Sequence, residues 1–148
     1  MKKTSIIFSL SLALSLIFIA LVGAAGCQKH GINGDLDGMW QIMEVEQLGP
    51  EGEVEGSFAP DQRYICFQLH VCQLRLQSGP IGHLGAGNLT YSGNTVSLSF
   101  PYAETQEQID RLTQWGIYST APVFTVEVLD RSTLVMSSSA SRLICRRF

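Results

Sequence analysis

Hydrophobic and polar residues alternate in short runs after residue 38, and clusters of glycine, proline, serine and asparagine separate these runs. Alternation with a period of two is typical of β-strands that turn one face to a core and the other to solvent. In the first run, residues 39–48, Trp40 and Ile42 share one face, and Met43 and Val45 share the other. The later runs predict strands at residues 63–77, 88–92, 95–100, 123–129, 133–136 and 142–148.

Turn signals separate several of these strands. Residues 78–87 contain four glycines and a proline and predict a loop, and Gly93-Asn94 predicts a two-residue hairpin. Residues 63–77, rich in β-branched and aromatic side chains at their start, predict one continuous strand, and Phe58 belongs to an irregular approach to it.

One helix is predicted after the hairpin. Thr105 and Gln108 have the spacing of a capping box, in which each side chain bonds the backbone N–H of the other residue. Gly116 is the expected residue after the helix C-terminus. Three apolar residues form a narrow stripe on the helix: Ile109, Leu112 and Trp115.

Seven or eight strands with short connections and one helix define an all-β domain made of antiparallel hairpins. Closing such a sheet on itself removes its unpaired edges, which favours an up-and-down β-barrel of about eight strands with one short helix. We expect the helix to lie across one opening or flank of this barrel, with Ile109 and Leu112 facing inward.

The N-terminus has a different pattern, typical of a bacterial lipoprotein signal peptide. Lys2 and Lys3 precede an uncharged apolar run at residues 6–22, and Ala24-Ala25-Gly26 places small side chains directly before Cys27. Cys27 is therefore the predicted lipid attachment site. The predicted organisation is a signal peptide at residues 1–26, a tether at residues 27–35 and a barrel domain at residues 36–148.

An uncleaved transmembrane anchor is the alternative, because residues 4–26 are long enough to span a bilayer. The serines in the first half of this segment and its Ala-Ala-Gly-Cys ending favour the lipoprotein interpretation. Either anchor places the domain outside the cytoplasm, and two or three acyl chains hold a protein stably on a membrane. Gln28, rather than aspartate, after the cysteine indicates the outer membrane of the cell envelope, on its periplasmic or surface face.

Length and charge limit what the mature chain can do. Removing 26 of 148 residues leaves 122, enough for one domain with a core. Two lysines leave with the signal peptide, so the ten basic residues fall to eight against 13 acidic ones, a net charge of −5. Nucleic-acid binding needs an extended basic surface, and the one basic cluster is Arg142, Arg146 and Arg147. We therefore expect no nucleic-acid partner.

Three cysteines remain if Cys27 carries lipid: Cys66, Cys72 and Cys145. On one continuous strand Cys66 and Cys72 would stand roughly 20 Å apart, beyond the reach of a disulfide. A bridge would therefore join Cys145 to one of them. All three lie among apolar residues, which favours buried free thiols.

Metal binding and catalysis receive little support. His70 and Cys72 would lie roughly 6.5 Å apart on the predicted strand, but a complete zinc site needs Cys145 or His83 to arrive from elsewhere. The sequence has no Gly-x-Ser-x-Gly or His-x-x-x-His motif, and its glycine-rich loop opens no helix. The acidic residues at Glu44 to Glu55 are typical of a solvated edge. We therefore expect no enzyme activity, no metal and no cofactor.

Two motifs give the mature chain a resemblance to a known family. Leu36-Asp37-Gly38-Met39-Trp40 opens the first strand, and Leu143-Ile144-Cys145-Arg146-Arg147-Phe148 forms the last. A Gly-x-Trp opening, a meandering β-domain and an arginine in the final strand resemble the lipocalin superfamily, and more closely the small lipocalin-like lipoproteins of Bacteroidota.

The resemblance implies structural roles for Gly38 and Trp40. The Trp40 ring would close one end of the barrel, and an arginine of the last strand would stack on it. Alternation places Arg147 on the face of Leu143 and Cys145, whereas Arg146 is on the opposite face. Both arginines remain candidates for this contact.

Two functions agree with these observations. The first is a non-enzymatic envelope lipoprotein, held to the membrane by its N-terminal lipid, whose barrel binds a small apolar ligand or is a vestige of such a binder. The second is an accessory module that presents a side-chain-filled barrel, or the loop at residues 78–87, to another envelope protein. Barrels of about eight strands can hold a ligand or be filled by side chains. An open apolar pocket favours the first function, and a solidly packed barrel favours the second.

Overall fold

The computed structural model describes residues 31–148, which form one sheet of ten strands with three short 3-10 helices and one α-helix. The predicted signal peptide and the predicted lipid attachment site Cys27 lie outside the described residues. The strands are β1 (Gly38–Leu48), β2 (Val54–Phe58), β3 (Arg63–Gln68), β4 (Val71–Leu76), β5 (Gly79–Pro80), β6 (Ala86–Ser92), β7 (Thr95–Ser99), β8 (Val123–Leu129), β9 (Thr133–Ser137) and β10 (Ser141–Arg147). The helices are η1 (Gly34–Leu36), η2 (His83–Gly85), α2 (Gln106–Leu112) and η3 (Thr113–Trp115).

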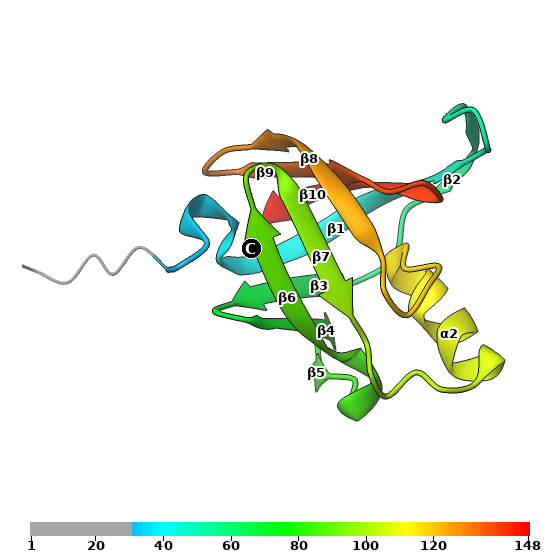
Figure 1. The fold of residues 1–148 in the computed structure, drawn as a ribbon, viewed down its shortest axis with the longest axis horizontal. Coiled ribbons are helices and arrows are strands. Elements are labelled where there is room, and N and C mark those ends of the chain that lie inside the picture. Colours follow the sequence, from blue (N-terminus) through cyan, green and yellow to red (C-terminus); the bar gives the residue numbers. More distant parts are fainter. Residues whose placement is uncertain (1–30) are drawn as a thin grey trace, which may run out of the picture.

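Eight of the ten strands close into a barrel (Figure 1). Their order is β1-β3-β4-β6-β7-β8-β9-β10, every pairing is antiparallel, and β10 pairs with β1 to complete the ring. This closure leaves no unpaired edge in the ring. The predicted antiparallel barrel of about eight strands with one short helix is confirmed.

The barrel has two covered ends. Helix η1 precedes the first residues of β1 and lies at the end where the chain enters the domain, and α2 lies at the opposite end (Figure 1). We name these the η1 end and the α2 end. Among residues 31–148, no helix has both the length and the apolar character that a membrane crossing requires.

One apolar cluster fills the space between the two ends. It includes Leu36 of η1, residues from each of the eight ring strands, and Leu112, Trp115 and Ile117 at the α2 end. The largest side chains that are fully buried are Trp40, Phe67, Phe100 and Phe124. The core therefore runs continuously along the barrel axis.

A β-bulge corrects the predicted faces of the first strand. The register of β1 against β10 shifts between Ile42 and Glu44, so two residues of β1 oppose one of β10 at that point. After the bulge, Val45 points into the core beside Trp40 and Ile42, and Met43 is exposed. The prediction that Val45 and Met43 share a face was wrong for this reason.

The prediction of one strand at residues 63–77 was also wrong. The chain turns at Leu69-His70, so β3 and β4 form a hairpin with Phe67 opposite Cys72 and Cys66 opposite Gln73. Leu69 has φ of 54° and no glycine, proline or asparagine occupies the turn, which explains why the sequence carried no turn signal. Strand β2 was missed as well; it pairs with the second half of β1 outside the ring, at residues predicted to be irregular.

The helix agrees with its prediction. The Thr105 side chain accepts a hydrogen bond from the N–H of Gln108, and the Gln108 side chain accepts one from the N–H of Thr105. Leu112 is fully buried, and Ile109 packs against the core. Gly116 follows η3 with φ of 72°, in the left-handed conformation expected after a helix.

Gly116 generates the first prediction, because it combines a positive φ with close packing. A Cβ at Gly116 would lie 2.3 Å from Cδ2 of Leu143 and 3.0 Å from Cγ1 of Val45, whereas a Cβ at Gly93, with φ of 62°, would meet nothing within 4 Å. Gly116→Ala should lower the free energy of unfolding by about 2–5 kcal/mol, from left-handed strain and overpacking together. Gly93→Ala should lower it by about 1–2 kcal/mol, from strain alone.

Urea denaturation of both variants measures the difference. Equal losses for Gly116→Ala and Gly93→Ala would show that η3 does not pack against β1 and β10 as the structure describes.

Candidate functional site

The η1 end is closed by a tryptophan with an arginine stacked on it. Trp40 and Arg147 are cross-strand partners on β1 and β10, and the guanidinium carbon of Arg147 lies 4.3 Å from the centroid of the Trp40 ring. Trp40 is fully buried and donates its indole N–H to the carbonyl of Leu36, 2.9 Å away. A cation over an indole face is attracted by the electron density of the ring.

Arg147 also holds η1 in place. Its Nη1 donates to the carbonyl of Asp37 at 3.0 Å, and its Nη2 donates to the carbonyl of Asp35. Gly38 makes room for this arrangement, because a Cβ there would lie 2.6 Å from Nη1 of Arg147 and the backbone has φ of 135°. Of the two candidate arginines, the structure places Arg147 on the ring, while Arg146 donates to Gln41 on the outer surface.

The turn before η1 is bonded to the barrel wall. Asn33 is buried, and its Nδ2 donates to Oδ1 of Asp37 at 2.6 Å and to the carbonyl of Leu69 at 2.7 Å. The second bond joins the chain at residue 33 to the turn between β3 and β4. Residues 31–35, which belong to the predicted tether, thus contact the η1 end of the barrel.

The α2 end has its own plug. Trp115 is buried, donates its indole N–H to the carbonyl of Arg75 at 3.3 Å, and has the guanidinium of Arg63 at 4.8 Å from its ring centroid. The hydroxyl of Ser141, which is fully buried, donates to the carbonyl of Gly116 at 2.6 Å. Both ends are therefore covered by a tryptophan under an arginine and by hydrogen bonds to the backbone.

Several pockets lie at the barrel surface and its ends. One pocket of about 520 Å³ is lined by η1 and the adjoining ends of β1 and β3, with Cys66 and Leu69 in its wall. Another, of about 600 Å³, lies where β3 begins and β4 ends, at residues 61–63 and 76–78. A third, of about 490 Å³, lies between residues 118–123 and residues 138–140. All three are open to solvent, and the axis of the barrel is occupied by the continuous apolar cluster.

The three cysteines of the described chain are unpaired. Cys72 and Cys145 are buried in the core, whereas Cys66 is half-buried and faces outward. Burial raises the pKa of all three thiols, to about 12 for Cys145, and Arg75 partly offsets this effect at Cys66. Thiols with raised pKa values are poor nucleophiles, because the thiolate is the reactive form.

The predicted spacing of Cys66, His70 and Cys72 rested on a continuous strand and is corrected by the hairpin. His70 lies in the turn, Cys72 faces the core, and Cys66 stands on the neighbouring strand with its side chain on the opposite face. Within residues 31–148 no group of three or more histidine, cysteine or acidic side chains is placed to hold a metal ion.

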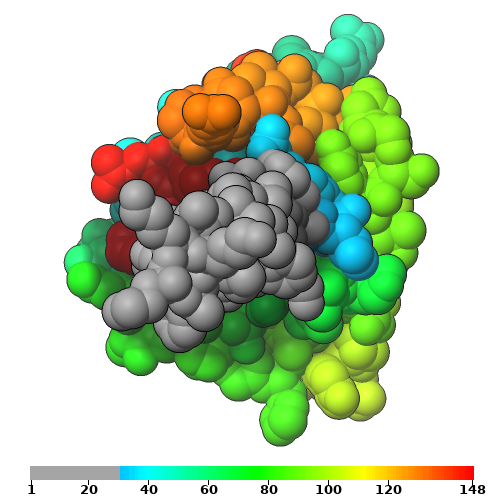
Figure 2. Space-filling model, turned by 90° about the vertical axis from the view of Figure 1, so that its left-hand side faces the viewer, coloured from blue at the N-terminus to red at the C-terminus, as the bar shows by residue number. Residues whose placement is uncertain are grey.

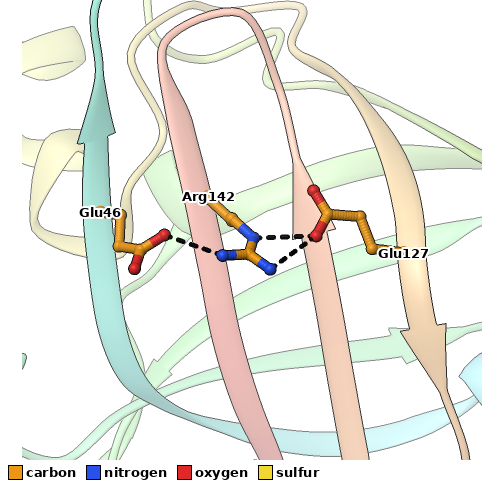
Figure 3. A network of polar contacts seen from close by, with 3 residues as sticks. All are labelled: Glu46, Glu127 and Arg142. Carbon is orange, nitrogen blue, oxygen red and sulfur yellow. Dashed lines mark hydrogen bonds and ion pairs between the residues drawn. The ribbon is translucent and has the colours of Figure 1, made fainter. Parts of the chain in front are cut away.

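An ion-pair network crosses the outer face of the barrel (Figure 3). Arg142 of β10 bonds Glu46 of β1 at 3.2 Å and Glu127 of β8 at 2.8 Å, and these contacts raise the pKa of the guanidinium. Ser137, opposite Arg142 on β9, is small and lets Arg142 reach across to β8. Partly exposed pairs of this kind contribute about 0.2–1 kcal/mol each. The carboxylates of Glu46 and Glu127 are therefore both held by Arg142 on the barrel wall.

Comparison with known proteins agrees with this geometry. A family model described as a lipocalin-like domain matches residues 19–148, and the chain belongs to this family. No curated protein matches the chain significantly.

Two solved structures are similar to the chain. One is a lipocalin-like protein from Bacteroides uniformis, with a TM-score of 0.56 and 25% identity over 78% of this chain and 100% of that chain. The other is an uncharacterized protein from Bacteroides eggerthii, with a TM-score of 0.54 and 15% identity over 76% of this chain and 99% of that one, a likeness of fold. The resemblance that the two sequence motifs indicated is confirmed at the level of the family.

The contrast between Arg147 and Arg146 generates the second prediction. Arg147→Ala removes the stack on Trp40 and the bonds to two carbonyls, so the free energy of unfolding should fall by about 2–4 kcal/mol. Arg146→Ala removes one exposed hydrogen bond and should change it by less than about 1 kcal/mol. Chemical denaturation followed by tryptophan fluorescence measures both values, and a loss at Arg146→Ala as large as that at Arg147→Ala would contradict the assignment.

Proposed function

We propose that this protein is a non-enzymatic, lipid-anchored module of the cell envelope that acts through its outer surface, as an interaction or accessory component. The observation that carries the proposal is the continuous apolar cluster between the two plugged ends. A lipocalin-like barrel that carries a ligand needs interior space for it. Here Trp40, Phe67, Phe100 and Phe124 occupy that space and are at most 1% exposed.

The proposed anchor is Cys27. The small residues before it and the charged and apolar segments that precede them support lipidation. Gly31, the first described residue, lies at the η1 end, four residues after Cys27. An anchor at Cys27 would therefore hold the domain by its η1 end, at the outer membrane.

The side chains with catalytic potential support a non-enzymatic role. Glu46 and Glu127 are engaged by Arg142, and the thiols of Cys72 and Cys145 are buried with raised pKa values. The members of this family share a barrel of the kind that generally binds rather than catalyses. The alternative function, binding of a small apolar ligand, would use the pocket beside Cys66 and Leu69, because that pocket lies at the η1 end and reaches the core residue Phe67.

Native mass spectrometry of the protein purified from its own membranes tests the proposal. The expected mass is that of residues 27–148 with acyl chains on Cys27 and with no additional small molecule. Cys27→Ser should give the uncleaved precursor of 148 residues without fatty acid.

Two results would contradict the proposal in different ways. A stoichiometric small molecule that leaves on collisional activation would favour the ligand-binding alternative. If the Cys27→Ser variant carried the same acyl chains as the unchanged protein, Cys27 would not be the lipid attachment site.

A further inference from the structure

We propose that the η1 end of the barrel rests on the lipid bilayer, with the side chains of Ile32, Leu69 and Val71 inserted at the boundary between headgroups and acyl chains. We name these three side chains the contact triad. This inference rests on the proposed lipid anchor and adds the surface through which the folded domain meets the membrane.

The contact triad is apolar and exposed, with 59% of Ile32, 53% of Leu69 and 49% of Val71 open to solvent. The hydrogen bond from Asn33 to the carbonyl of Leu69 ties the residue after Ile32 to the turn between β3 and β4. Val71 is the first residue of β4, two positions after Leu69. The three residues therefore belong to one corner of the η1 end.

The fold itself does not require leucine at position 69. Leu69 has φ of 54°, a conformation in which a glycine or asparagine would be less strained. Its side chain nevertheless points away from the core and remains exposed. Contact with a bilayer would explain why this position carries a leucine, because the exposed apolar side chain would then leave water and enter the apolar part of the membrane.

The short segment between Cys27 and the domain is the reason to propose the bilayer as the partner of the contact triad. Four residue steps separate Cys27 from Gly31, so the lipid attachment site is at most about 14 Å from the first described residue. Gly31 is held at the η1 end, where its carbonyl accepts a hydrogen bond from the N–H of Gly34. The opposite end of the barrel is roughly 35 Å further along β1, an 11-residue strand, and lies beyond this reach.

Figure 2 shows the η1 end of the molecule, where the segment that begins the described chain (blue), the turn between β8 and β9 (orange) and the C-terminal residues (red) face the viewer. Charge at this end is mixed, since Asp35, Asp37 and Asp130 accompany Arg131, Arg146 and Arg147. Among the described residues of this end, basic side chains therefore do not outnumber acidic ones, and no excess of positive charge attracts lipid phosphates. Apolar insertion beside a covalent lipid is therefore the contact that these residues support.

Depth-dependent fluorescence quenching tests the orientation. The full chain, lipidated in its host, is reconstituted into phosphatidylethanolamine–phosphatidylglycerol vesicles that contain lipids spin-labelled on the acyl chain. An environment-sensitive fluorophore is attached at Leu69→Cys or Ile32→Cys, and at Val123→Cys as the matched control, each with Cys66→Ser. Val123 is 55% exposed and lies in the first position of β8, toward the α2 end. Cys72 and Cys145 are buried and stay unlabelled.

We expect the spin-labelled lipids to quench the probes at positions 69 and 32 several-fold more than the probe at position 123. Vesicle flotation is measured on the same samples. If the protein floats with the vesicles and the three probes are quenched equally, or position 123 is quenched most, the orientation is overturned and the anchor stands. If the acylated protein does not float with the vesicles, the proposed anchor fails and the orientation fails with it.

Discussion

The antiparallel pairing of β1 with β10 is the contact on which the rest of the structure depends. It joins the first and last strands of the domain over seven residue pairs, from Trp40 opposite Arg147 to Gln47 opposite Ser141. Without it the sheet would have two open edges, and closure removes them. The same register places Arg147 over the Trp40 ring and Arg142 beside Glu46. Closure of the barrel, sealing of the η1 end and the ion-pair network on the wall are thus three results of one strand pairing.

Much of this fold could be predicted from the sequence, because its signals are local. Alternating hydrophobicity located most of the ring strands, Gly93-Asn94 marked a hairpin, and Thr105 with Gln108 marked the helix start. The family could be identified from the Gly-x-Trp opening and the arginines near the C-terminus, since both motifs are short and continuous in sequence.

The features that sequence reasoning missed depend on tertiary contacts. The turn at Leu69-His70 contains no turn-forming residue, and strand β2 is a peripheral strand with only one partner. The bulge that brings Val45 inward exists only in the pairing with β10. Arg147 rather than Arg146 stacks on Trp40 because the pairing of β10 with β1 places Arg147 opposite Trp40 and Arg146 opposite Gln41. Asn33 and Ser141 carried no recognised motif, and their roles are hydrogen bonds to backbone carbonyls distant in sequence.

The contents of the barrel connect the fold to the proposed function. Lipocalin-like barrels of eight strands differ in whether side chains or a ligand fill the interior. In this chain the interior is occupied by tightly buried aromatic and aliphatic side chains, and a tryptophan–arginine stack covers each end. The proposed function therefore uses the outer surface of the barrel, and the predicted tether before residue 36 would place the η1 end closest to the proposed anchor.

The filled interior is the central claim, and titration of the protein with a fluorescent fatty-acid probe tests it most directly. A filled barrel predicts no saturable increase in probe emission and no displacement by unlabelled fatty acid. Saturable binding of one probe per chain, competed by the unlabelled fatty acid and accompanied by a change in the emission of the buried tryptophans, would contradict the account.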